Sequence, residues 1–305
     1  CRWQHLSPDT QLEGNAGLAA LIEQFSGFEA PAASWETQLL PRRMRGYQGT
    51  LLDPLVGSGR TTWLRLSPKK ALGGRHNGTL RNTPLALMPR AEVRAWLACT
   101  AFNADRELST VAQRVAEHIE QRGASFFDDI VDHTGLLPTQ CEQALDELAA
   151  AGLVTCDSFA GLRALTTPSA RRNSPGRRTR RNTSPGIDEA GRWDRVRRQH
   201  ASDDSTTYTD DDLEIIVRGL LRRYGVVFRA LVQRESGLPP WRHLLWTLRR
   251  LEACGELRGG RFVAGYSGEQ FALPEAATAL RDTRKRPALG IVTVVNAADP
   301  LNLVG

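Results

Sequence analysis

The chain has 305 residues, a formal net charge of +6 and 24% charged residues, which fits two or three globular domains rather than one small module. Its 41% hydrophobic content is enough for real cores, and no apolar run approaches the roughly 18 residues of a membrane span. Five scattered cysteines without a C-x-x-C pair, and histidines without ligand spacing, argue against a disulfide framework or a metal site and favour a cytoplasmic location.

The predicted elements, in chain order, fall into three sets. Helices are predicted over residues 16–25, 31–45 and 49–56, then 109–122, 125–133 and 138–151, and finally 210–224, 226–235 and 239–254. Each set is followed by a β-prone run, at residues 61–64, 153–155 and 256–257. The last run is expected to turn at Gly259-Gly260 and to return over residues 261–264, because glycines adopt the positive φ values of a two-residue hairpin turn.

A repeated pattern supports these sets. Two leucines three residues apart, followed after four residues by a glycine, occur as Leu52-Leu55-Gly59, Leu145-Leu148-Gly152 and Leu248-Leu251-Gly255. Such leucines share one helix face, and the glycine supplies the left-handed residue that ends the helix. Helix, turn, helix and hairpin is the order of a winged helix-turn-helix. A single copy of the pattern would mark only a helix end.

We therefore expect a mainly α fold with small β wings (α+β), built from tandem winged-helix modules and the start of a β-rich C-terminal module. The expected parts are a first module, complete or partial (1–66), a connecting segment (67–108), a second module (109–167), a disordered Arg-rich linker (168–190), a third module (191–283) and a truncated β-rich segment (284–305). Cys1 in place of Met and the apolar C-terminus predict that the chain is a fragment of a longer polypeptide.

Two strings imitate nucleotide-binding motifs. Residues 57–62 resemble the end of a P-loop, but Pro54 occupies the place of its first glycine and Arg60 that of its lysine. They are better interpreted as a turn from helix to wing. Residues 188–191 resemble a DEAD-type box but follow a linker rather than a buried strand. No ATPase site is therefore expected in this chain.

The third module carries the strongest nucleic-acid pattern. In the helix over 239–254, leucines form the core stripe, and the opposite face combines arginines for phosphates and base edges with an aromatic that can stack. The candidate nucleic-acid-binding residues are Arg242, Trp246, Arg249 and Arg250, with Arg258 and Arg261 beside the wing turn. The alternative is a solvated basic face with Trp246 packed on a neighbouring domain. The corresponding helix over 138–151 places acidic residues outward, which predicts a structural or protein-binding second module.

The linker over 168–190 concentrates the positive charge. Residues 168–200 hold ten arginines against three acids, and the remaining chain is nearly neutral. The segment is rich in Pro, Gly, Ser and Arg without apolar periodicity, which predicts disorder. Its candidate phosphate contacts, which need no base sequence, are Arg171, Arg172, Arg177, Arg178, Arg180 and Arg181. A merely solubilising linker is the alternative.

Several strings together resemble the C-terminal extension of the large helicase-related (Lhr) ATP-dependent DNA helicases of the DEAD/DEAH-box superfamily. They include residues 28–36, 157–165, 191–193, 223–228, 238–242, 259–271 and 298–305. The family's Gly-Arg-Trp is followed by apolar residues, whereas this chain has Asp194-Arg195-Val196 after Trp193, which places that packing contact in doubt. The nearest candidate for a catalytic carboxylate in a matched string is Asp299, and no catalytic residue is assigned.

The resemblance implies a DNA-binding and assembly region of a 3′-to-5′ helicase linked to DNA repair. Its ATPase core, with ATP and Mg²⁺, is implied to lie upstream in the same polypeptide, so no cofactor is expected in this chain. Expected partners are single-stranded or forked DNA, the helicase core and further copies of the chain, without a membrane. Two alternatives stay open: a DNA glycosylase-like module acting on damaged bases, and a sequence-specific winged-helix regulator.

Overall fold

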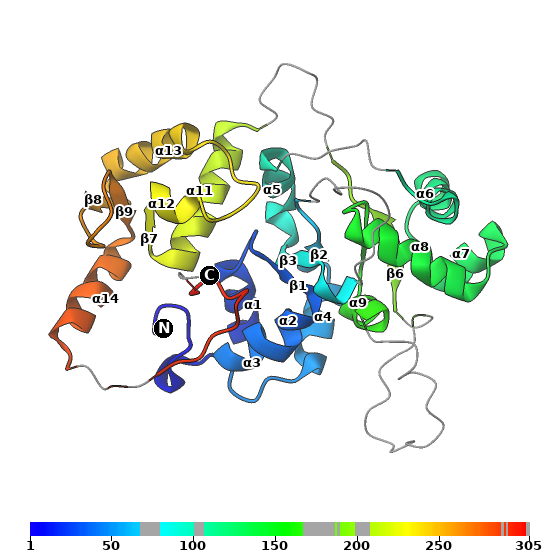
Figure 1. Ribbon diagram of the computed structural model, residues 1–305, viewed down its shortest axis with the longest axis horizontal. Helices are drawn as coiled ribbons and strands as arrows, with labels where there is room; N and C mark the ends of the chain where they lie inside the picture. Colours follow the sequence, from blue (N-terminus) through cyan, green and yellow to red (C-terminus); the bar gives the residue numbers. More distant parts are fainter. Residues whose placement is uncertain are drawn as a thin grey trace.

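The computed structural model describes residues 1–67, 80–100, 107–166, 187, 190–198, 208–287, 290 and 292–302. These residues form three modules of one topology, each with a three-stranded antiparallel sheet in which the last strand lies between the other two (Figure 1). Helices occupy most of the remaining ordered structure, so the fold is α+β with tandem winged helices, as the sequence predicts. In the described ranges, no helix is both long and apolar enough to cross a bilayer.

The first module extends from the N-terminus to Pro89. Its elements are η1 (Pro8–Thr10), α1 (Gly14–Gln24), β1 (Glu29–Pro31), α2 (Ala32–Ser34), the π-helical turn η2 (Trp35–Leu39), α3 (Leu40–Arg43), η3 (Gly49–Leu51), α4 (Leu52–Gly57), β2 (Thr61–Leu64), η4 (Leu80–Asn82) and β3 (Pro84–Pro89). The P-loop-like string 57–62 is the turn from α4 into β2, as predicted. After β3 come η5 (Arg90–Glu92) and α5 (Val93–Cys99).

The second module repeats this order. Its elements are α6 (Thr110–Arg122), β4 (Ser125–Phe126), α7 (Phe127–Thr134), α8 (Pro138–Ala150), β5 (Val154–Cys156), α9 (Phe159–Thr166) and β6 (Arg192–Arg195). Ser109 caps α6, since its hydroxyl accepts the backbone N–H of Ala112. Trp193 on β6 is fully buried and makes an edge-on contact with Trp63, so the packing of the Gly-Arg-Trp string exists despite Asp194.

The third module begins after residue 207. Its elements are α11 (Asp210–Tyr224), β7 (Val226–Phe228), α12 (Arg229–Val232), α13 (Trp241–Ala253), β8 (Arg258–Gly260), β9 (Gln270–Ala272) and α14 (Pro274–Lys285). Thr209 and Asp212 form a reciprocal cap at the start of α11. The described residues after α14 form no strand; they run back to the first module, where Asp299 and the N-terminal residue Gln4 both contact Arg43 (Figure 1).

The modules share cores because β3 is buried on both faces. Leu85 and Leu87 belong to a hydrophobic cluster that spans the first and second modules. The alternate residues Ala86 and Met88 belong to a second cluster, which includes α5, α11 and α13. The outer face of the first sheet is therefore covered by the third module, and the three modules pack as one body.

Trp96 on α5 shows how closely the first and third modules approach. Its ring is almost fully buried, and its indole N–H donates to Ser26 Oγ at 3.1 Å. A Cβ at Gly27, which has φ +77°, would come within 2.3 Å of this ring, and a Cβ at Gly219 within 3.0 Å. Both positions therefore require glycine for the ring to fit between α1 and α11.

Several predicted boundaries need correction. The first module does not end at residue 66, because β3 is the central strand of its sheet and lies inside the expected connecting segment 67–108. The second module does not end at 167, because its central strand, β6, begins at Arg192, within the expected third module. Residues 125–126 and 226–228 are short strands rather than the first turns of helices. The described part of 284–305 is not β-rich.

Candidate nucleic-acid interface

The third helix of each winged-helix module is the one that usually enters a DNA groove, and here the three copies differ in what covers them. Helix α4 of the first module packs against α9, where the Arg163 guanidinium binds Glu36 at 2.7 Å and Asp53 at 2.7 Å. Burial lowers the pKa of Arg163, but the Glu36 and Asp53 carboxylates outweigh this effect and hold the pKa above its usual value. Helix α4 therefore takes part in the packing between the first and second modules.

Helix α8 of the second module also makes contacts within the protein. The Asp146 carboxylate, predicted to point outward, accepts the backbone N–H of Leu80 from the first module at 3.3 Å. Burial raises the pKa of Asp146 to about 6. Glu147 accepts both the backbone N–H and the hydroxyl of Ser109. These contacts agree with a structural second module.

Helix α13 of the third module keeps an exposed face. Leu244, Leu248 and Leu251 are buried beneath it, whereas Trp246 on the opposite face has 80% of its surface exposed. No described residue covers the Trp246 ring, unlike the alternative in which it packs on a neighbouring domain. A large aromatic ring left this open, beside arginines, suits stacking on unpaired bases.

Two arginines of α13 pair with carboxylates, of which Glu269 is exposed and Glu214 is half-buried. Arg249 makes a two-pronged ion pair with Glu269 at 2.8 and 3.0 Å, and Arg250 pairs with Glu214 at 2.8 Å. The Glu269 carboxylate raises the pKa of Arg249. Because exposed ion pairs contribute little net free energy, a phosphate can replace the Glu269 carboxylate at small cost. The same contacts hold the guanidinium groups at the helix surface.

The wing lies between β8 and β9. Gly259 and Gly260 belong to β8, so the predicted two-residue turn at these glycines is wrong; the return strand is β9, not residues 261–264. The turn instead spans 261–269, with positive φ at Gly265 and Gly268. The longer turn is fixed by the buried amide of Gln270, which accepts the backbone N–H groups of residues 262 and 263 and donates to the carbonyl of 263.

The two arginines of the wing are accessible to a ligand. Arg258 and Arg261 are exposed, and neither forms an ion pair within the described part of the chain. Tyr266 at the tip is 45% exposed and lies 4.7 Å from the Phe228 ring, centroid to centroid. The structure thus brings four of the six predicted residues together on α13 and the other two onto the adjoining wing. The six linker arginines, 171 to 181, lie outside the described residues.

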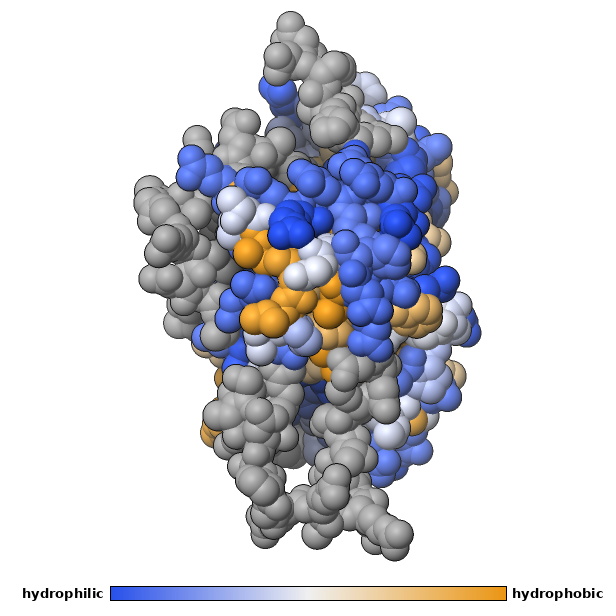
Figure 2. Space-filling model, turned by 90° about the vertical axis from the view of Figure 1, so that its right-hand side faces the viewer, coloured by the Kyte–Doolittle hydropathy of each residue, from blue (hydrophilic) through white to orange (hydrophobic). Residues whose placement is uncertain are grey.

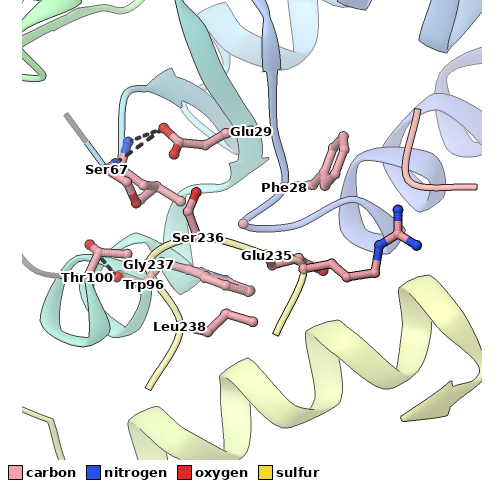
Figure 3. Close-up of a pocket in the computed structure, with 12 residues that line it drawn as sticks. Phe28, Glu29, Ser67, Trp96, Thr100, Glu235, Ser236, Gly237 and Leu238 are labelled. Atoms are coloured by element: carbon pink, nitrogen blue, oxygen red, sulfur yellow. Dashed lines mark hydrogen bonds between the residues drawn. The ribbon is translucent and has the colours of Figure 1, made fainter. Parts of the chain in front are cut away.

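A small pocket lies between the first and third modules (Figure 3). Its volume is about 130 Å³, with Trp96 as one wall and Ser67, Thr100 and Ser236 around it. The Glu29 carboxylate accepts the backbone N–H groups of 66 and 67 at 2.7 and 3.3 Å, and burial raises its pKa. Ligand pockets are usually about 300 Å³ or larger, so this cavity is a packing gap rather than a binding site.

Asp299 is buried as one half of an ion pair. Both of its carboxylate oxygens lie 2.8 Å from Nη2 of Arg43, and the two side chains are 1% and 0% exposed. Its Oδ1 also accepts the backbone N–H of Leu301 at 2.9 Å. The carboxylate therefore ties the C-terminal segment to α3. Sequence reasoning missed Arg43 because its partner is 256 residues away.

The other end of the chain reinforces this junction. The Trp3 indole N–H donates to the carbonyl of Arg222 at 2.9 Å, and the Gln4 amide to that of Arg223 at 2.7 Å. Arg223 is fully buried, and both oxygens of Glu235 lie 2.5 Å from its Nη1. Buried Arg43 therefore joins the first module to the C-terminal segment, and buried Arg223 joins the third module to Ser26 of the first.

An apolar patch lies at the far end of the second module. Figure 2, which faces this end, shows hydrophobic residues gathered within a hydrophilic surface. Phe126 and Leu137, which flank α7, are 49% and 65% exposed. Exposed apolar patches with a polar rim are typical of protein contact surfaces.

The repeated sheet order and the three-helix sets define the chain as a tandem winged-helix protein. Sequence models described as "Large helicase-related protein, winged-helix domain" match residues 1–89 and 206–290, which coincide with the first and third modules. The "Lhr helicase/ probable uracil glycosylase" of Mycolicibacterium smegmatis is 31% identical over 99% of this chain and 20% of its own length. The "Lhr helicase/uracil glycosylase" of Escherichia coli is 29% identical over 96% of this chain and 20% of its own length.

The chain therefore belongs to the large helicase-related family and corresponds to part of its C-terminal region. It spans about one fifth of the length of these two relatives.

Proposed function

We propose that this chain is a DNA-binding and assembly region of an ATP-dependent 3′-to-5′ DNA helicase that acts in DNA repair. The helicase core, with its ATP and Mg²⁺, would lie elsewhere in the same polypeptide. The observation that carries the DNA-binding part is the exposed Trp246, set among arginines on α13. Assembly would use the apolar patch of Phe126 and Leu137, with a second copy of the chain as the partner.

The arginines and the tryptophan have separate tasks in this proposal. Arg242, Arg249 and Arg250 bind phosphates of a single strand or fork and release counterions, which gives affinity without base sequence. Arg258 and Arg261 on the wing bind the neighbouring phosphates, and the linker arginines extend the contact. Trp246 stacks on an unpaired base, which selects single-stranded over duplex DNA because duplex bases already stack on one another.

The test separates these tasks. The triple variant Arg242→Glu, Arg249→Glu, Arg250→Glu removes three phosphate contacts, so the slope of log K against log salt for a labelled single strand should fall by about 2, with a loss of about 50-fold at 0.15 M salt. The matched control is a charge reversal by substitution with Glu at Arg281, Arg284 and Arg286, which are exposed on and just after α14. Unchanged binding in the α13 variant would contradict the proposal.

Trp246→Ala provides an independent check. Its side chain is 80% exposed, so its removal leaves the core intact. The loss of one stacked base should cost about 1–3 kcal/mol of binding free energy and leave the salt slope unchanged. An altered circular dichroism spectrum in either variant would show a folding defect rather than a lost contact.

A second candidate is base excision, which the names of both relatives favour by including uracil glycosylase. A glycosylase needs a carboxylate or similar group that reaches an extruded base. Asp299, the candidate in the matched string, is instead enclosed with Arg43. Incubation of this chain with uracil-containing DNA, followed by cleavage at abasic sites, tests the candidate; absence of cleavage would remove it for this part of the polypeptide.

A further inference from the structure

A groove of about 440 Å³ lies where the sheets of the first and second modules meet. The edge strands β2 and β5 adjoin there through the hydroxyls of Thr62 and Thr155, which lie 3.5 Å apart, and Thr155 also donates to the carbonyl of Trp63. Helix α5 and the residues after β6 form the sides. The groove is thus built from two modules and a connecting helix, which hold its shape.

The lining of this groove is strongly basic. Four arginines line it, two from η5 and α5 and two from the end of β6 and the residues after it, with one carboxylate, Asp194; the arginines are Arg90, Arg94, Arg195 and Arg197. The Asp194 carboxylate accepts the backbone N–H of its own neighbour at 2.7 Å. Val93, Leu97 and Val196 also line it; Leu97 and Val196 are buried and form part of its floor, whereas Val93 is half-buried.

The four guanidinium groups are differently engaged. Arg94 pairs with the buried Asp212 at 2.7 Å but keeps 60% of its side chain exposed, and Arg195 pairs with the exposed Glu120. Arg90 donates from Nε to a backbone carbonyl at 3.0 Å, which leaves its terminal nitrogens for a ligand. Arg197 is exposed and pairs with no described residue.

A short chain of contacts connects the groove to α13. Arg94 binds Asp212, whose carboxylate accepts the hydroxyl and backbone N–H of Thr209 at 2.9 Å. The preceding residue, Tyr208, shares a hydrogen bond of 2.6 Å with Nδ1 of His243. Arg242, a candidate residue of α13, donates to the other ring nitrogen of His243 at 3.0 Å. The groove therefore approaches α13 at its N-terminal end.

We propose that this groove is a second nucleic-acid site, which holds the phosphodiester backbone of a single strand that continues to α13. The proposal rests on the DNA-binding function proposed above and extends it to residues of the first and second modules. Planar guanidinium forks match phosphate oxygens, and the apolar lining accommodates sugars and bases. Asp210 and Asp211, in the first turn of α11, are exposed and would repel a strand that passed over them.

An acidic protein segment is the other ligand that such charges attract. Two features favour nucleic acid. The groove approaches a helix whose exposed face pairs arginines with an open tryptophan, and a strand of regularly spaced phosphates can serve both surfaces at once. The apolar lining of the groove also offers contact to bases, which an oligoglutamate chain lacks.

The test uses the two arginines without an ion pair to any described residue. In the 305-residue chain, Arg90→Glu with Arg197→Glu should lower affinity for a labelled 20-nucleotide single strand about tenfold at 0.15 M salt and reduce the salt slope by about 1.4. The matched control is Arg281→Glu with Arg284→Glu, at exposed positions on α14. A thermal unfolding curve like that of the wild type shows that the groove variant is folded.

The outcomes separate this inference from the function on which it rests. If the groove variant keeps its affinity and slope while the α13 variant loses them, the groove proposal is wrong and the proposed function stands. If only the groove variant loses affinity, the strand binds the groove and α13 is not the contact surface. If the groove variant retains DNA affinity but no longer binds oligoglutamate, the groove takes an acidic protein segment, which overturns the proposal.

Discussion

Replacement of Asp299 by Ala tests whether this carboxylate has a structural task or a chemical one. Its partner, Arg43, has no exposed surface, and the charge has no water to replace the lost carboxylate. Burial already lowers the pKa of Arg43, and the neighbouring Asp299 charge opposes this effect. After the substitution the guanidinium keeps only the carbonyl of Leu39, a weak contact with Gln4 at 3.4 Å and the face of the Phe25 ring.

The size of the effect follows from this burial. Removal of one partner from a buried ion pair costs about 3–5 kcal/mol. An unfolding entropy of about 2.1 cal/mol/K per residue gives about 0.64 kcal/mol/K for 305 residues, so the melting temperature should fall by about 5–8 °C. This conversion applies because the modules share cores and should unfold together.

The assay is thermal unfolding followed by circular dichroism, with two companion variants. Asp299→Asn should destabilise similarly, because the amide keeps the acceptor for Leu301 but not the charge. The double variant Arg43→Met, Asp299→Leu should recover most of the loss, since apolar replacement of a whole buried pair is often neutral. A melting temperature within 1 °C of the wild type after Asp299→Ala would refute this reasoning. DNA affinity at low temperature should be unchanged.

Two further predictions concern the second module. The folded-state pKa of Asp146, about 6, exceeds its ordinary value of 3.8, so its contribution to stability is fully present below pH 3.8 and is lost as the pH rises through 6. Asp146→Asn should therefore gain stability relative to the wild type as thermal unfolding is repeated from pH 4 to 7; a constant difference would contradict the buried position. For assembly, light scattering should give a multiple of the monomer mass, reduced by Phe126→Glu with Leu137→Glu, and a monomeric wild type would exclude this contact.

Local features of the fold were predictable from the sequence. The glycines of the three repeats, Gly59, Gly152 and Gly255, all have φ between +72° and +79°, as their helix-ending role requires. The leucines that precede them are buried in each case. Helix periodicity and glycine conformation depend on residues a few positions apart, so a single sequence contains the information.

Strands that close each sheet were not predictable in the same way. β3 and β6 pair with strands on both sides, and each joins its sheet only after a long intervening segment. The apolar run Leu85–Met88 was an available signal, because a strand buried on both faces shows no alternation. Two-residue β4 leads directly into α7, so its residues were included in a predicted helix.

The candidate site shows the same division. Helical period placed Trp246 and the arginines of α13 on one face, and that face is exposed. Their partners Glu269 and Glu214 lie 20 and 36 residues away, so the ion pairs were not predictable. The basic groove was missed because its arginines come from separate segments that only the packing of modules brings together.

A DNA strand bound to this chain should contact the exposed face of α13. Photocrosslinking detects such a contact: a single strand carrying 4-thiothymidine is irradiated with this chain, and crosslinked tryptic peptides are identified by mass spectrometry. Peptide 243–249, which contains Trp246, should be prominent among the products and should disappear in the Trp246→Ala variant. Crosslinks confined to peptides of α6, α7 and α14, with 243–249 unmodified, would contradict it.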